Sequence, residues 1–155
     1  MPEKLEPTAL RSDWAYTALK MSKFLSAYFA TLVVMVTLDL IWLGVVAKPI
    51  YQAGIGHLMA DKPDVAIAIV FYAVFALGLM VFAVAPWAAQ GGWLKMAAMA
   101  GLFGFFAYAT YDLTNLATLK QWPLSLALTD MAWGTVVSAV SACAGKWIWL
   151  QFDSA

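Results

Sequence analysis

Hydrophobic residues are concentrated in four long blocks along the chain, and short polar segments separate them. The blocks cover residues 24–46, 65–86, 93–119 and 124–150. A helix that crosses a bilayer needs roughly 20 mostly apolar residues, so each block is long enough for one crossing. The segment QWP at 121–123 separates the last two blocks, and its proline suits the first turn of a helix. The pattern predicts an all-α integral membrane protein, a four-helix bundle.

The first twenty residues differ from the rest of the chain. They carry both signs of charge and contain Pro2 and Pro7, whereas Met21 begins a segment typical of the start of a membrane protein. We therefore interpret residues 1–20 as an N-terminal tail or extension and residues 21–155 as one four-span membrane domain. The first block is longer than the roughly 7 to 15 apolar residues of a signal-peptide core, which favours a retained helix.

The distribution of basic residues predicts an orientation, because lysine and arginine favour the cytoplasmic ends of membrane helices. Four spans place both termini and the second loop on one side of the membrane. That side holds Lys4, Arg11, Lys20, Lys23, Lys95 and Lys146, and the opposite side holds Lys48, Lys62 and Lys120. Both termini are therefore predicted to be cytoplasmic. Without residues 1–20 the two sides are equal, so the prediction depends on that segment.

Composition agrees with a membrane protein and excludes some partners. Hydrophobic residues make up 64% of the chain and charged residues 12%, with a mean hydropathy of +0.79. Nine basic and nine acidic residues cancel, and the sequence has no basic cluster or glycine-rich phosphate loop, so a nucleic acid or nucleotide partner is not indicated. The expected partner is the lipid bilayer.

Three aspartates interrupt the apolar blocks: Asp39, Asp112 and Asp130. A charge at mid-bilayer costs at least about 2.5 to 3.5 kcal/mol on insertion scales. At 1.5 Å per residue, Asp39 and Asp112 lie about 10 Å before the ends of their blocks, and Asp130 about 9 Å after the start of its block. The first and third helices run in one direction and the fourth runs back. The three carboxyl groups are therefore predicted to lie in one layer.

Aromatic and polar residues accompany these acids at helical spacing. Tyr108, Tyr111, Asp112 and Asn115 fall at positions i, i+3, i+4 and i+7, which is one face of a helix. Small residues also recur on the last two helices and permit close helix contact: Gly101, Gly104, Gly134, Ser138 and Ser141.

We predict an acidic and aromatic pocket that opens toward the non-cytoplasmic side. Trp42 and Trp133 follow Asp39 and Asp130 by three residues and are expected to line it. The ligand-binding candidates are Asp39, Asp112, Asp130, Tyr108, Tyr111, Asn115, Trp42 and Trp133. Alternatively, the acids only join helices through hydrogen bonds, each worth around 0.6 kcal/mol.

Metal and nucleophile chemistry find little support in the sequence. The single histidine, His57, and the single cysteine, Cys143, do not supply a zinc site, a disulfide or a Ser-His-Asp triad. Mg²⁺ or Ca²⁺ would accept aspartates and Asn115 as ligands, but no spacing singles that out. We predict no metal site, and the sequence leaves any cofactor unknown.

Three functions remain open. The first is binding or transport of a proton, a cation or the polar head of an amphipathic small molecule by the aspartates. The second is a membrane enzyme for a lipid or isoprenoid-like substrate, with an aspartate as general acid or base and Tyr108 or Tyr111 assisting. The third is an accessory structural subunit of a membrane complex or oligomer.

Three blocks in order resemble a known family: LDLIWLGVVAKPIYQ at 38–52, YATYDLTNLATL at 108–119 and WPLSLALTDMAWG at 122–134. They resemble the bacterial family of predicted membrane proteins called domain of unknown function 2177, from about residue 21 to the C-terminus. The resemblance implies a small multi-pass protein of the bacterial inner membrane and no established activity. The tryptophan-rich sensory protein family is similar in composition only, because its members have five spans.

Overall fold

The computed structural model of the protein describes residues 7–89 and 92–153, and no strand occurs among them. The chain is all-α, as predicted. Its helices, in order, are α1 (Pro7–Ile41), α2 (Lys48–Ile55), α3 (Val65–Leu79), α4 (Ala85–Trp87), α5 (Trp93–Thr118) and α6 (Leu124–Gln151). Two π-helical stretches, η1 (Trp42–Val46) and η3 (Met80–Val84), and one 3₁₀ turn, η2 (Gly56–Leu58), complete the set.

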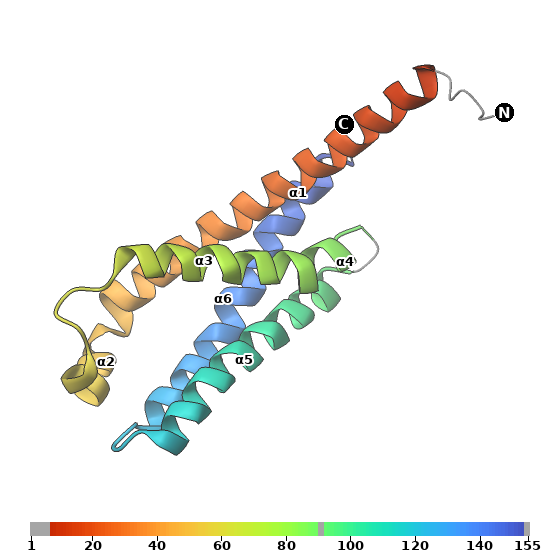
Figure 1. Ribbon diagram of the computed structural model, residues 1–155. Helices are drawn as coiled ribbons and strands as arrows, with labels where there is room; N and C mark the ends of the chain where they lie inside the picture. The colour runs from red at the N-terminus through yellow and green to blue at the C-terminus, as the bar shows by residue number, and fades with distance from the viewer. Residues whose placement is uncertain (1–6, 90–91, 154–155) are drawn as a thin grey trace.

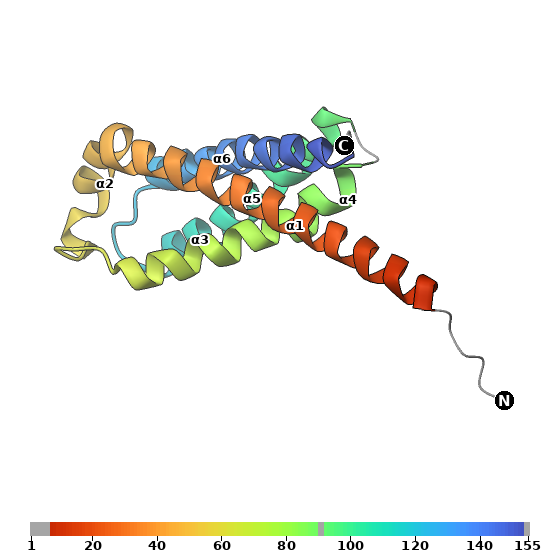
Figure 2. The same cartoon turned by 90° about the horizontal axis from the view of Figure 1, so that it is seen from above.

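The helices pack along one another around α6 (Figures 1 and 2). Helices α5 and α6 form an antiparallel hairpin, α1 packs along α6, and α3 packs against α1. The end of α1, helix α2, the start of α3 and the α5–α6 turn gather at one end of the molecule, and the C-terminus and α4 lie at the other. The N-terminal part of α1 extends beyond the remaining helices.

Three helical segments are long and apolar enough to cross a membrane: Tyr16–Val46, Val65–Trp87 and Leu124–Gln151. Helices α3, α5 and α6 begin at Val65, Trp93 and Leu124, where the hydrophobic blocks begin. Helix α5 has 26 residues but is outside this apolar set, because polar residues around Asp112 lower its hydropathy. Helix α1 begins at Pro7, so part of the segment interpreted as a tail is helical.

Two prolines account for the π-helical stretches. Proline lacks an N–H donor, and its ring clashes with the carbonyl four residues earlier in an α-helix. For Pro49 that carbonyl belongs to Val45 in η1, and for Pro86 it belongs to Phe82 in η3. In a π turn, backbone N–H groups bond to the carbonyl five residues earlier. The Ala47 N–H, for example, donates to the Trp42 carbonyl at 2.7 Å. Stretch η1 follows Asp39 closely and leads into α2.

The core has two parts. The larger cluster joins α1, α3, η3, α5 and α6 through residues that include Met35, Leu79, Met80, Met96 and Val137. The smaller cluster lies between α2 and the α5–α6 turn and consists of Ile55, Trp122, Leu126 and Ala127, with Tyr51 and Leu116 packed against it. Along α5 and α6, Asp112 and Asp130 lie between residues of the larger cluster and residues of the smaller one.

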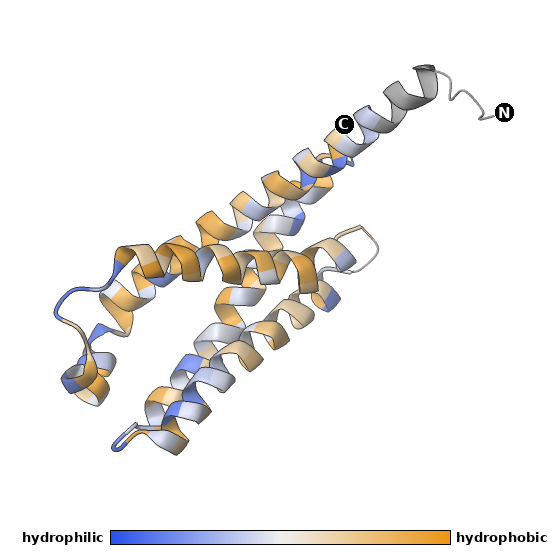
Figure 3. Cartoon of the chain, viewed as in Figure 1, coloured by the Kyte–Doolittle hydropathy of each residue, from blue (hydrophilic) through white to orange (hydrophobic). Residues whose placement is uncertain are grey.

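The outer surface is largely apolar. Large side chains on α3 such as Ile67, Val70 and Val74 are exposed, and hydrophobic colour covers most of α3 and the central part of α1 in Figure 3. Hydrophilic colour on α5 and α6 is concentrated toward their shared turn. An apolar exterior of this extent suits lipid rather than water as the surrounding solvent.

Candidate functional site

Asp39, Asp112 and Asp130 are all buried, with exposed fractions of 4%, 0% and 3%. They come from α1, α5 and α6 respectively. Asp130 interacts electrostatically with both Asp39 and Asp112, and the phenol of Tyr108 interacts with all three acids. The structure therefore brings the three predicted acids into one region, with Tyr108 among them.

The carboxyl of Asp39 has a well-formed partner on another helix. The indole Nε1–H of Trp133 in α6 donates a hydrogen bond to Asp39 Oδ1 at 2.7 Å, and Tyr72 of α3 interacts more weakly. Trp133 also stacks on Trp42, with ring centroids 4.3 Å apart and ring planes at 6°. Two tryptophans selected from the sequence thus form one pair, and one of them holds Asp39.

Replacing Trp133 by phenylalanine tests this contact. We expect Trp133→Phe to lower the free energy of unfolding by about 1.5 to 3 kcal/mol, because Asp39 loses a buried donor. Trp42→Phe is the matched control, since it alters the other ring of the stack while Trp42 Nε1 has no acceptor among the described residues. Thermal unfolding in detergent measures both variants. Equal losses would assign the stabilisation to the ring stack and not to the hydrogen bond.

Asp130 is held by a residue that the sequence did not indicate. The hydroxyl of Tyr51 in α2 donates to Asp130 Oδ1 at 2.5 Å. Burial raises the pKa of the Tyr51 hydroxyl, and Asp130 raises it further, so Tyr51 keeps its proton and remains a donor. One signal in the sequence could have found it: Tyr51 and Ile55 stand at i and i+4, which marks the inner face of a short helix.

Asp112 differs from the other two acids. It is completely buried, and among the described residues no donor lies in hydrogen-bonding geometry to either of its oxygens. The side chain of Trp122 interacts with it, but the Trp122 indole N–H has no acceptor in bonding geometry either. A buried polar group without a partner is costly, and a buried unpaired charge far more so. A proton on Asp112 would lower this cost, because it removes the charge.

Tyr111 and Asn115 lie at the edge of this region. The ring of Tyr111 packs edge-on against Trp122, with centroids 5.8 Å apart and an interplanar angle of 80°. Its side chain is exposed and interacts with Asn115 and with Asp112. The two residues sit beside Asp112, as their helical spacing predicts, but they leave its oxygens without hydrogen bonds.

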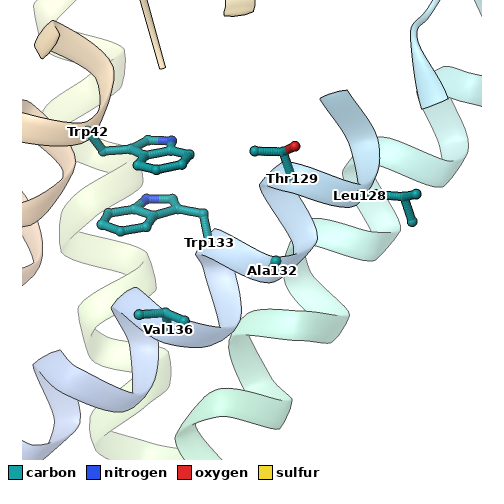
Figure 4. A pocket seen from close by; sticks show the side chains of 6 residues that line it. All are labelled: Trp42, Leu128, Thr129, Ala132, Trp133 and Val136. Atoms are coloured by element: carbon teal, nitrogen blue, oxygen red, sulfur yellow. The ribbon is translucent and has the colours of Figure 1, made fainter. Parts of the chain in front are cut away.

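Trp42 and Trp133 also line a shallow hollow on the outside of α6 (Figure 4). The hollow has a volume of about 450 Å³, and the other residues that line it are Leu128, Thr129, Ala132 and Val136. Its lining includes the two predicted tryptophans and none of the three aspartates. Trp133 is the residue that the hollow and the acidic region share, because its ring faces the hollow while its N–H binds Asp39.

Within residues 7–89 and 92–153, no three histidine, cysteine, aspartate or glutamate side chains are close enough together to hold a metal ion. The three aspartates therefore interact through space without meeting at one point. His57 lies exposed in η2, and Cys143 in α6 is a free thiol.

A comparison with protein families gives the match that the three sequence blocks suggested. The family described as predicted membrane protein, DUF2177, matches residues 24–147. The chain belongs to this family. The part of the DUF2177 chain that matches contains every aspartate, tyrosine and tryptophan described in this region, and residues 1–20 lie outside it. No curated protein and no solved structure matches the chain. Family and structure together establish a membrane protein that contacts the lipid bilayer.

Proposed function

We propose that this membrane protein binds protons reversibly at Asp112 as part of a binding or transport function. The observation that carries the proposal is the complete burial of Asp112, together with the lack of a hydrogen-bond donor to either of its oxygens within residues 7–89 and 92–153. A bound proton removes the charge and turns the acid into a donor. The same group would accept another small cation in place of the proton.

The surroundings of the three acids support this assignment. Four side chains that act on them without adding charge are Trp133, Tyr72, Tyr51 and Trp122. Those four are neutral donors. Asp39 and Asp130 each receive a hydrogen bond that stabilises a carboxylate, whereas Asp112 receives none from the part of the chain that the structure describes. A single proton in this region is therefore best placed on Asp112.

We further propose that α5 is a fourth membrane span, so that the chain is a multi-pass four-helix protein of the bacterial inner membrane. At 1.5 Å per residue its 26 residues extend about 39 Å, enough to cross a bilayer. Its outer face carries exposed apolar side chains, among them Leu102, Phe106 and Leu113. Its polar residue Asp112 is turned inward, where polar groups of membrane helices belong.

Lysine–tryptophan pairs support cytoplasmic termini. Lys23 lies over the ring of Trp149, Lys95 over Trp87 and Lys146 over Trp93, with nitrogen-to-centroid distances of 4.7, 4.0 and 5.3 Å. Lys23 also forms an ion pair with Asp153. Basic residues and interfacial tryptophans gathered at one end are typical of the cytoplasmic boundary of a membrane protein.

An amphipathic molecule is the second candidate ligand, and the hollow beside Trp133 favours it. An apolar chain would lie against Leu128, Val136 and the two tryptophan rings. A cationic head group near Trp133 would be attracted by the aromatic faces and by Asp39 beneath. This ligand would enter from the bilayer, whereas a proton also needs access from water.

Dicyclohexylcarbodiimide tests the protonated state, because this apolar reagent reacts with protonated carboxyl groups in apolar surroundings. We expect it to label Asp112 in the protein in lipid vesicles, with the adduct located by peptide mass spectrometry. Asp112→Asn should remove the label. Asp64→Asn is the control, since Asp64 is an exposed helix cap and asparagine is an equally good cap.

Two outcomes would contradict the proposal. Absence of any adduct at Asp112 in the folded protein would mean that it holds no exchangeable proton. An adduct together with unchanged proton flux into vesicles after Asp112→Asn would assign the acid to helix packing or to an enzyme instead of transport.

A further inference from the structure

Helix α2 lies between two candidate membrane spans, after Val46 and before Val65, and its Tyr51 contacts the buried Asp130. Its two faces differ: Lys48 and Gln52 are exposed, whereas Tyr51 is half-buried and Ile55 is buried. Figure 1 shows α2 beside the end of α1 and the start of α3, at the end of the molecule that carries the α5–α6 turn. The inner face of α2 thus covers the acidic region from the aqueous side.

One polar contact and one apolar cluster hold α2 in place. The Tyr51 hydroxyl bonds to Asp130 across a separation of 79 residues and also interacts with Asp112 and Tyr108. Ile55 packs with Trp122, Leu126 and Ala127 in the smaller core cluster, which is separate from the main core. Two of the residues that hold α2, Asp130 and Trp122, also act on Asp112.

Exposed glycines stand on either side of α2, whereas Ala47, which joins η1 to α2, is buried. A Cβ atom added at Gly44 in η1 or at Gly56 in η2 would meet no other atom within 4 Å. By contrast, a Cβ at Gly54 inside α2 would lie 3.1 Å from Pro123 Cγ, at the start of α6. A side chain could therefore be added at Gly44 or Gly56 without a clash, whereas Gly54 packs closely against the residue that precedes α6.

We propose that α2 is a cap over the aqueous entrance to Asp112 and Asp130, and that the Tyr51 hydroxyl is the latch that keeps it closed. This inference rests on the proposed proton site, because the cap regulates access to that site. Opening breaks the bond between Tyr51 and Asp130, moves Ile55 away from Trp122, and gives water a path to the carboxyl groups. Closing restores the hydrogen bond and excludes water.

Two carbodiimides test the proposed cap and the proposed proton site separately. A water-soluble, cationic carbodiimide reaches Asp112 or Asp130 only through the aqueous entrance, whereas dicyclohexylcarbodiimide also arrives through the bilayer. In each case the carboxyl proton passes to a reagent nitrogen as the oxygen bonds to the central carbon, and the adduct rearranges to a stable acylurea. Labelling rates are read by peptide mass spectrometry on the full chain in lipid vesicles.

The latch is tested by Tyr51→Phe, which removes the hydroxyl and keeps the ring. We expect aqueous labelling to become about tenfold faster, the change that corresponds to loss of one hydrogen bond of about 1.4 kcal/mol. Tyr28→Phe is the matched control, because it removes another hydrogen bond between helices, from Tyr28 to the Ala73 carbonyl, away from α2. An unchanged rate in Tyr51→Phe would overturn the role of the latch.

The cap is tested by a reversible cross-link between Gly54→Cys and Pro123→Cys in a Cys143→Ala background, closed by oxidation or by a short thiol cross-linker. We expect aqueous labelling to fall at least about tenfold when the link is closed and to recover on reduction, with labelling by dicyclohexylcarbodiimide unchanged. If aqueous labelling persists with the link closed, the proposal that α2 is a cap is wrong, while the proposed proton site is not contradicted. Absence of labelling by dicyclohexylcarbodiimide in the reduced protein would overturn the proton site itself.

Discussion

Gly104→Ala is expected to destabilise the protein by about 3 kcal/mol or more, or to prevent folding, because overpacking against backbone leaves no side chain free to move aside. A Cβ atom at Gly104 would collide with the Gly134 carbonyl oxygen and with the side chain of Ser138. Helices α5 and α6 would have to separate at this point. Thermal unfolding in detergent and the yield of folded protein measure the effect.

Gly101→Ala is the control for that experiment. Gly101 lies on the same face of α5 one turn earlier, and a Cβ atom there would meet Thr135 Cγ2 at 3.3 Å, a contact that a small movement relieves. We expect a change within about 1 kcal/mol. Equal stability of the two variants would show that α5 and α6 do not require the close contact at Gly104.

Asp112→Asn is expected to abolish proton binding and at the same time to stabilise the fold. Since neither Asp112 oxygen has a hydrogen-bond donor among the described residues, the substitution breaks no hydrogen bond seen there. The expected gain in the free energy of unfolding is about 1 to 3 kcal/mol at alkaline pH, where the wild type would have to bury an ionised group. It should disappear at acid pH, where both side chains are neutral. Unfolding temperature against pH measures the difference.

Asp39→Asn is the comparison variant, because its free energy of unfolding is not expected to rise. Asp39 accepts a hydrogen bond from Trp133, and replacing a charged acceptor by a neutral one weakens that bond by about half. Asp39→Asn is therefore expected to leave stability unchanged or to lower it. A loss of stability in Asp112→Asn as large as that in Asp39→Asn would mean that Asp112 has a structural partner and is not a site for exchange.

The sequence predicted where several helices begin and that the three aspartates lie at similar depth, because both features depend on regular spacing. Long apolar blocks indicate where α3, α5 and α6 begin, and rise per residue places Asp39, Asp112 and Asp130 at similar depth. Their interaction with Tyr108 in the structure agrees with that geometry. The family assignment, made from three short blocks, was confirmed by the match to residues 24–147.

Other features depend on contacts that no local pattern encodes. The bond from Tyr51 to Asp130 joins residues 79 positions apart, and it exists only because α2 folds back over the bundle. The π turns before Pro49 and Pro86 are a response of the backbone to proline, which hydropathy does not register. The separation between the acids and the hollow lined by Trp42 and Trp133 depends on which way each side chain turns within its helix.

The contact between Gly104 and Gly134 also restricts how this protein changes shape. Where two helix backbones approach this closely, little space is left for one helix to rotate or slide against the other. We therefore expect the hairpin of α5 and α6 to move as a single body that carries Asp112 and Asp130 together. On this view, a rearrangement that alters the surroundings of these acids comes from displacement of α1, α2 or α3 relative to the hairpin.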